Sequence, residues 1–237
     1  PGRRRGPRDL RGRGGPAVAG RVQPRQRAGA LHRAARDAVP SADGLWRVRL
    51  GIFGGSFDPP HLGHLLPVID AAEALGLDAV RFVPAAVQPL KVGRASAGPP
   101  NRLAMTERLV AGIPGFSADS TEIDRAGLSF TVDTLATLAA ETPGAALVLI
   151  VGADAFALFE QWRDPERIRA LADVAVLVRG GESAQVAGRT AGVKLLQTRR
   201  VDISSTELRA RVADGRTIRG FVPAAVADYI AEHRLYK

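Results

Sequence analysis

The sequence predicts an α/β protein with a doubly wound parallel sheet, helices on both faces and a single domain. From residue 47 onward, short apolar runs of strand length alternate with longer segments of helical periodicity. The most hydrophobic run, 146–151, contains six consecutive apolar residues, which is typical of a central strand covered on both faces. The chain has 237 residues, of which 46% are hydrophobic, enough for one sizeable core.

Residues 1–46 differ from the rest of the chain. They contain eleven arginines and three acids, and therefore carry +8 of the net charge of +9. The remainder is close to neutral, so its charge does not support a nucleic-acid-binding face on the folded domain. High Gly and Pro content, with Trp46 as the single aromatic residue, predicts a disordered extension over 1–46 and a folded domain over 47–237. An RNA-binding arm and a transit peptide are the alternatives to a plain tail.

The predicted elements follow in order from these patterns. Strands are predicted at 48–53, 79–83, 116–123, 146–151, 174–178 and 193–198, where apolar runs are bounded by polar, Gly or Pro residues. Helices are predicted at 63–75, 101–111, 131–141, 153–161, 165–170, 205–213 and 223–233, from apolar spacing and from flanking residues. Asn101 is the predicted cap of the second helix, and Pro143 and Gly144 end the third. Residues 85–100 read as a loop.

Composition excludes several classes of protein. Without cysteine, the chain has no disulfide framework, no thiolate metal site and no cysteine nucleophile. No apolar run approaches the roughly 18–20 residues needed to cross a bilayer, so no membrane partner is expected. Both observations suit a cytoplasmic protein.

A phosphate site is predicted directly after the first strand. Gly54 and Gly55 lack Cβ atoms, so the backbone can approach a ligand and adopt positive φ. The helix start that follows offers N–H groups and a positive dipole end to an anion. His61 and His64 can face one side of this helix start and donate hydrogen bonds to phosphate oxygens. Half of a zinc site is the alternative, but no third ligand stands at a suitable spacing, so no protein-bound metal is expected.

A second phosphate-binding segment is predicted near the start of the penultimate helix. Ser204, Ser205 and Thr206 can cap that helix, and Arg209 lies one turn further, where it can bind phosphate bidentately. The alternative is an ordinary helix cap with a surface arginine.

These two segments carry a family resemblance. GGSFDPPHLGH (54–64) resembles the (H/T)xGH signature of the nucleotidyltransferase superfamily, and ISSTELR (203–209) resembles its second signature, ISSTxIR. With SFTVDTL (129–135), GADAFALFEQW (152–162) and VPAAVQPLK (83–91), they resemble the bacterial nicotinate-nucleotide adenylyltransferases over about residues 50–233. The resemblance implies a Rossmann-like fold, with C-terminal helices after the second motif. It also implies adenylyl transfer from ATP to nicotinate mononucleotide in NAD biosynthesis, giving nicotinate adenine dinucleotide and pyrophosphate.

The resemblance also assigns residues. His61, His64 and Arg209 are expected to be catalytic. The expected ATP-binding residues are Gly54, Gly55, Ser56, Phe57, His61, His64, Gly152, Asp154, Ile203, Ser204, Ser205 and Arg209. Lys91, Thr131 and Trp162 are expected to bind the mononucleotide, and Leu90 stands where the family usually has histidine. Mg²⁺ is expected with ATP, held mainly by phosphates and water.

Two alternatives stay open at this point. The acceptor can instead be nicotinamide mononucleotide or another phosphate monoester such as phosphopantetheine. The chain can also be a non-catalytic nucleotide-sensing protein that binds RNA through residues 1–46. The expected partners are small molecules, without nucleic acid or membrane, and a homo-oligomer is compatible with the sequence.

Overall fold

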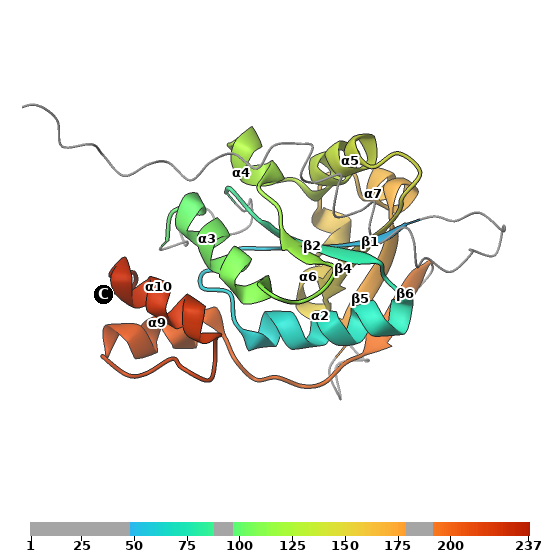
Figure 1. Cartoon of the computed structure of the whole chain (residues 1–237). Coiled ribbons are helices and arrows are strands. Elements are labelled where there is room, and N and C mark those ends of the chain that lie inside the picture. Colours follow the sequence, from blue (N-terminus) through green and yellow to red (C-terminus); the bar gives the residue numbers. More distant parts are fainter. Residues whose placement is uncertain (1–47, 88–96, 179–191) are drawn as a thin grey trace, which may run out of the picture.

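Six parallel strands form one sheet in the order β3-β2-β1-β4-β5-β6, which confirms the predicted doubly wound architecture. The computed structural model describes residues 48–87, 97–178 and 192–237 (Figure 1). The strands are β1 (Arg49–Gly55), β2 (Ala79–Pro84), β3 (Phe116–Ala118), β4 (Ala146–Gly152), β5 (Asp173–Val178) and β6 (Val193–Gln197). Residues 1–46, for which an extension outside the fold was predicted, lie outside the described residues, as do Leu90 and Lys91.

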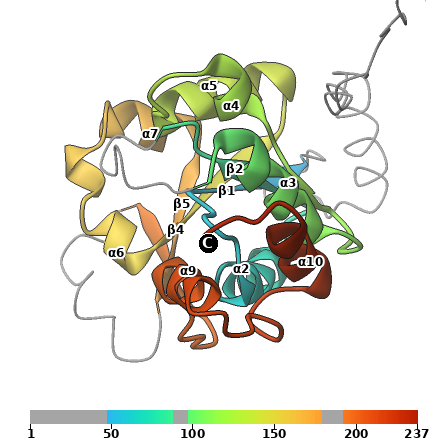
Figure 2. The same ribbon diagram turned by 90° about the vertical axis from the view of Figure 1, so that its left-hand side faces the viewer.

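Helices cover both faces of the sheet (Figures 1 and 2). One face packs against α2 (Leu62–Leu75), α3 (Pro99–Val110), α9 (Ser205–Ala213) and α10 (Ala224–Glu232). The other packs against α5 (Thr131–Glu141), α6 (Ala153–Phe156), the 3₁₀ turn η2 (Phe159–Gln161) and α7 (Pro165–Leu171). The five residues 147–151 of β4 are all buried, as predicted for a central strand. No helix in the described part of the chain combines the length and the apolar character that a membrane span requires.

The predicted strand 116–123 is wrong beyond Ala118. The Asp119 carboxylate accepts hydrogen bonds from the Thr121 N–H, at 2.8 Å, and from the buried Arg81 guanidinium, at 3.0 Å. Such a side-chain turn ends the strand and starts the short helix α4 (Thr121–Arg125).

Two predicted helices also differ from the structure. Helix α3 begins at Pro99, because prolines in a first turn need no N–H partner, and the Asn101 side chain accepts from the Tyr229 hydroxyl instead of capping. The predicted helix 153–161 is split into α6 and η2. The Leu158 N–H bonds to Ala155, a tighter i to i+3 step, which lets the side chains of both Phe156 and Phe159 enter the core.

Candidate active site

The candidate site lies where β1 and β4 end side by side. Phe53 pairs with Ile150, so Gly54, Gly55 and Gly152 lie at the same carboxyl edge of the sheet. From this edge β1 continues to α2 on one face, whereas β4 continues to α6 on the other. Neighbouring strands whose connections diverge in this way leave a crevice at their carboxyl ends, where ligands of such sheets bind.

The loop after β1 has a different backbone from the one expected. Gly54 and Gly55 are extended residues of β1 that pair with β2, so their predicted positive φ is wrong; the left-handed residue of this loop is Phe57, at φ 49°. The Phe57 side chain is buried in the core, so this residue has only its backbone to offer to a nucleotide. A Cβ added to Gly54 would meet only the Val83 carbonyl, 3.9 Å away. Gly54 therefore faces open space.

The two histidines form one stacked unit at the start of α2. His61 is the N-cap and is buried, and the ring centroids of His61 and His64 are 3.7 Å apart. The His61 backbone N–H donates to His64 Nδ1 at 3.3 Å. Since Nδ1 accepts, a neutral His64 carries its proton on Nε2, which can donate to a ligand oxygen.

Part of the expected anion site on α2 is already occupied. The N–H of Leu62, the first residue of this helix, donates to the Phe221 carbonyl at 3.0 Å. Because this N–H is not available to a ligand, the binding of an anion depends more on the imidazoles of His61 and His64 than on the backbone of the helix terminus.

The second signature packs directly on the first. Ser204 caps α9, as predicted, by accepting from the Glu207 N–H at 3.1 Å. Ser205 Oγ donates to the Pro59 carbonyl at 2.9 Å, and Arg209 Nη1 donates to the Asp58 carbonyl at 2.7 Å. The residues joined by these two bonds are 146 and 151 positions apart in the sequence. Two distant segments thus build one wall of the site.

Gly63 allows this close approach. A Cβ at this position would lie 2.9 Å from His61 Nδ1 and 3.3 Å from the carbonyl oxygen of Ile203, the first residue of the second signature. Both distances are shorter than ordinary contacts, so close packing requires a residue without a side chain between the two histidines.

The segments expected to bind the acceptor also meet. Ser129 is tied to the end of β2, since its Oγ accepts from the Ala86 N–H at 2.9 Å, and Thr131 is the first residue of α5. Arg163, next to Trp162, stacks on the Phe130 ring at 4.8 Å and pairs with Asp133 at 3.5 Å. Trp162 is thereby held near the start of α5, with its ring on Phe159 at 5.3 Å.

Asp154 lies in the first turn of α6, directly beyond β4, and is exposed. The N-cap of this helix is Gly152, so Asp154 does not cap it. A Cβ on Gly152 would meet nothing within 4 Å, which leaves open space beside Asp154 at the carboxyl edge.

Sequence reasoning missed Arg102, whose buried side chain supports the loop after β1. Its buried guanidinium donates to the carbonyls of Ala97, Ser56 and Ala86 at 3.0, 2.7 and 2.9 Å. Burial lowers the pKa of Arg102, and the neighbouring Asp58 opposes that shift. A signal was available, because Arg102 is in phase with Met105 and Leu109 on the buried stripe of α3.

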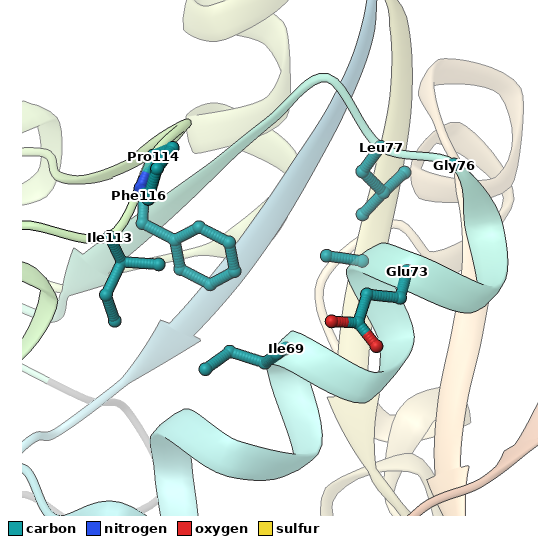
Figure 3. Close-up of a pocket in the computed structure, with 8 residues that line it drawn as sticks. Ile69, Glu73, Gly76, Leu77, Ile113, Pro114 and Phe116 are labelled. Carbon is teal, nitrogen blue, oxygen red and sulfur yellow. The ribbon is translucent and has the colours of Figure 1, made fainter.

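A separate hollow of about 390 Å³ lies away from this edge (Figure 3). It is lined by Ile69, Ala72, Glu73, Gly76, Leu77, Ile113, Pro114 and Phe116, at the amino ends of β2 and β3. Its lining is apolar apart from one carboxylate, so it is unsuited to a triphosphate. Across residues 48–87, 97–178 and 192–237, no three His, Asp or Glu side chains gather as a metal site.

Comparisons with known proteins agree on one family. A model of the cytidylyltransferase-like family matches residues 52–211. A probable nicotinate-nucleotide adenylyltransferase from Gemmatimonas aurantiaca is 47% identical over 197 residues, covering 80% of this chain and 93% of that protein. Another, from Thermus thermophilus, is 44% identical over 190 residues, covering 80% of this chain and 100% of that protein. The structure of Plasmodium falciparum nicotinic acid mononucleotide adenylyltransferase complexed with NaAD has a TM-score of 0.62 at 18% identity, covering 79% of this chain and 97% of that one, which shows the shared fold.

Proposed function

The chain belongs to the cytidylyltransferase-like family and, within it, to the nicotinate-nucleotide adenylyltransferases, and from this membership we infer its reaction. It transfers the adenylyl group of ATP to nicotinate mononucleotide, which yields nicotinate adenine dinucleotide and pyrophosphate, a step of NAD biosynthesis. The roles of individual residues, the metal and the cellular setting described below are part of the proposal.

The observation that carries the assignment of residues is the junction of the two signatures. Arg209 and Ser205 donate to the carbonyls of Asp58 and Pro59, which joins the start of α9 and the histidine loop (residues 56–64) into one surface. Imidazole, hydroxyl and guanidinium groups gathered at one edge suit a polyanion. We assign the triphosphate of ATP to this surface, together with Gly54, Gly55 and Ser56.

The proposed chemistry needs positioning and charge stabilisation rather than a base. The acceptor phosphate is already an anion, so it can attack the α-phosphorus of ATP in line while pyrophosphate leaves on the opposite side. The Nε2–H of His64 donates to the oxygens on which charge increases, and His61 holds its ring by stacking at 3.7 Å. Arg209 and Ser204 bind the β- and γ-phosphates, and Asp154 and Gly152 line the nucleoside side of the crevice.

Mg²⁺ is proposed to arrive with ATP. The donors at the junction of the signatures fit phosphate oxygens, whereas Mg²⁺ prefers oxygen ligands and retains several waters. When bound to the triphosphate, the ion would neutralise charge on the departing pyrophosphate. The protein groups then orient the nucleotide and supply hydrogen bonds.

Recognition of the acceptor is assigned to Thr131, Trp162 and Lys91. A flat indole face suits stacking on a pyridine ring. The N-terminus of α5 favours a carboxylate, and the ion pair of Arg163 with Asp133 at 3.5 Å offsets the acid in the first turn of this helix. These features favour nicotinate over nicotinamide as the ring.

The test is pyrophosphate release with ATP, Mg²⁺ and a panel of acceptors. We expect the highest kcat/KM with nicotinate mononucleotide, a lower value with nicotinamide mononucleotide and none with phosphopantetheine. Arg209→Gln should lower kcat/KM for ATP by about tenfold or more, because a charge-assisted phosphate contact is lost. Arg211→Gln is the matched control on the same helix, since this half-buried side chain bonds to the Thr217 carbonyl and touches none of the proposed phosphate-binding residues. Preference for another acceptor, or equal losses in both variants, would contradict the proposal.

The cellular setting completes the proposal. The partners are small molecules, ATP and nicotinate mononucleotide, with neither nucleic acid nor a membrane, and a homo-oligomer is compatible with it. We place the reaction in the cytoplasm, where ATP is available, and assign it to the domain formed by residues 47–237.

A further inference from the structure

The Asp58 carboxylate lies beneath the histidine loop and has no part in the proposed chemistry. It is 3% exposed. Its Oδ1 accepts from the Ala97 N–H at 3.1 Å and from the Tyr236 hydroxyl at 2.7 Å. A carboxylate buried this deeply requires hydrogen bonds, so both donors are needed where they are.

Tyr236 reaches this position from the turn after α10. Arg234 and Tyr236 have φ values of 51° and 65°, a left-handed conformation that residues other than glycine rarely adopt. The Leu235 N–H bonds to the Ile230 carbonyl at 3.0 Å and anchors the turn on α10. In Figure 2 the C-terminus lies in front of the sheet, with α9 and α2 below it and α10 and α3 to its right. The tyrosine thus enters the site from a segment that sequence reasoning left unused.

The hydroxyl of Tyr236 is a permanent donor. Burial raises the pKa of this phenol well above its usual value, and the Asp58 carboxylate raises it further. The proton therefore stays on the tyrosine at physiological pH, and Asp58 receives it as a hydrogen bond.

Asp58 links this donor to the catalytic arginine. Its side chain accepts from Tyr236, and its backbone carbonyl accepts from Arg209 Nη1 at 2.7 Å. Restraining the carboxylate also restrains the rotation of the adjoining peptide, and hence the direction of the carbonyl that holds the guanidinium. The hydroxyl of residue 236 and the guanidinium of residue 209 are thus connected through a single residue.

We propose that Tyr236 is a positioning residue for ATP, whose hydroxyl holds Asp58 so that the Asp58 carbonyl keeps Arg209 directed at the β- and γ-phosphates. The proposal rests on the function proposed above, in which Arg209 binds these phosphates. A purely structural tyrosine would lower stability without changing the affinity for one particular substrate.

The chain offers a matched control in Tyr229. This residue lies within α10, and its hydroxyl donates to Asn101 Oδ1 at 2.9 Å. Burial raises the pKa of Tyr229 as well. The bond ties α10 to α3 and touches neither the histidine loop nor Arg209. Tyr236→Phe and Tyr229→Phe thus remove the same atom from two similar bonds.

The experiment compares the two variants by titration calorimetry with ATP, by steady-state kinetics and by thermal unfolding. For Tyr236→Phe we expect about tenfold weaker ATP binding and a matching rise in the KM for ATP, because a hydrogen bond to a charged group is lost. The KM for nicotinate mononucleotide should stay within twofold. For Tyr229→Phe we expect a lower Tm with unchanged ATP affinity. ATP affinity within twofold of wild type in Tyr236→Phe, or equal losses in both variants, would overturn the proposal.

A double-mutant cycle tests the route through Arg209. In an Arg209→Gln background, Tyr236→Phe should weaken ATP binding no further, because the group being positioned is already absent. Additive losses would overturn the proposal. Binding of ATP is measured without the acceptor, so a wild-type protein that fails to use nicotinate mononucleotide would refute the proposed function while this cycle still decides the role of Tyr236.

Discussion

Substitution of Gly63 by alanine tests the packing of the two signatures with a single methyl group. Gly63 lies in the first turn of α2, and its φ is not in the left-handed region, so the backbone accepts alanine. Alanine is favoured over glycine by about 0.5–1 kcal/mol within helices. Backbone conformation and helix propensity alone therefore predict that Gly63→Ala leaves the stability of the protein unchanged or raises it.

The surroundings of the methyl group predict the opposite for activity. The new Cβ would lie 2.9 Å from His61 Nδ1, where an ordinary contact begins near 3.4 Å, so the ring must move by about 0.5 Å. His61 is buried and stacked on His64, so both imidazoles shift together. The Ile203 carbonyl, 3.3 Å away, blocks part of the alternative space.

We expect kcat to fall by about 10- to 100-fold in Gly63→Ala, because displaced donors no longer meet the developing charge. Tm should change by no more than about 3 °C, equivalent to roughly 1 kcal/mol for a domain of this size. The assay is pyrophosphate release at saturating substrates, with Tm from circular dichroism. Gly98→Ala is the control, since its Cβ would meet only Pro100 Cδ at 3.9 Å. A kcat within twofold of wild type in Gly63→Ala, or an equal loss in Gly98→Ala, would refute this reasoning.

Four further predictions concern single groups or segments. His64→Ala should lower kcat by about a hundredfold or more with little change in mononucleotide binding, and near-wild-type turnover would contradict its role. Arg102→Met should lower the free energy of unfolding by about 3–5 kcal/mol, measured in urea, because three buried carbonyls lose their donor; a loss below about 1 kcal/mol would count against it. The raised pKa of Tyr236 means that the folded state holds this proton more tightly than the unfolded chain, so the associated stability is complete below about pH 10 and is lost as the pH rises further. Tyr236→Phe should therefore lose less stability than wild type between pH 9 and 11, and equal losses would argue against the shift. Removal of residues 1–46 should change neither pyrophosphate release nor RNA retention, and a change in either would give this segment a role.

Local pattern was sufficient for most of the fold. The helix at 131–141 and the helix at 205–213 have the predicted bounds, and β4 is the buried central strand, because each is specified by its own periodicity and flanking residues. The strand predicted at 116–123 failed because Asp119 turns the chain there. That turn depends on Arg81, 38 residues earlier in the sequence, and no local pattern records such a partner.

The candidate site, too, was predictable where a local motif marks it and not where a residue depends on distant partners. Motif spacing singled out His61, Ser205 and Arg209, and in the structure Ser205 and Arg209 bond to the carbonyls of Pro59 and Asp58, just before His61 in the sequence. Arg102 and Tyr236 escaped notice because their partners are backbone carbonyls and one distant carboxylate, which carry no motif. The buried face of an amphipathic helix can still be searched for charged residues. Such a search of α3 would have found Arg102.

The contacts of the histidine loop also bear on how the protein folds. The loop is made early in synthesis, yet its bonds to Ser205, Arg209 and Tyr236 span 146, 151 and 178 residues. Closing such long stretches of chain costs entropy and slows folding. A nascent chain on the ribosome can therefore complete the sheet from β1 to β5 before it has an ATP site. Turnover would then mark the last step of folding, and ATP should bind only after the C-terminal turn has docked.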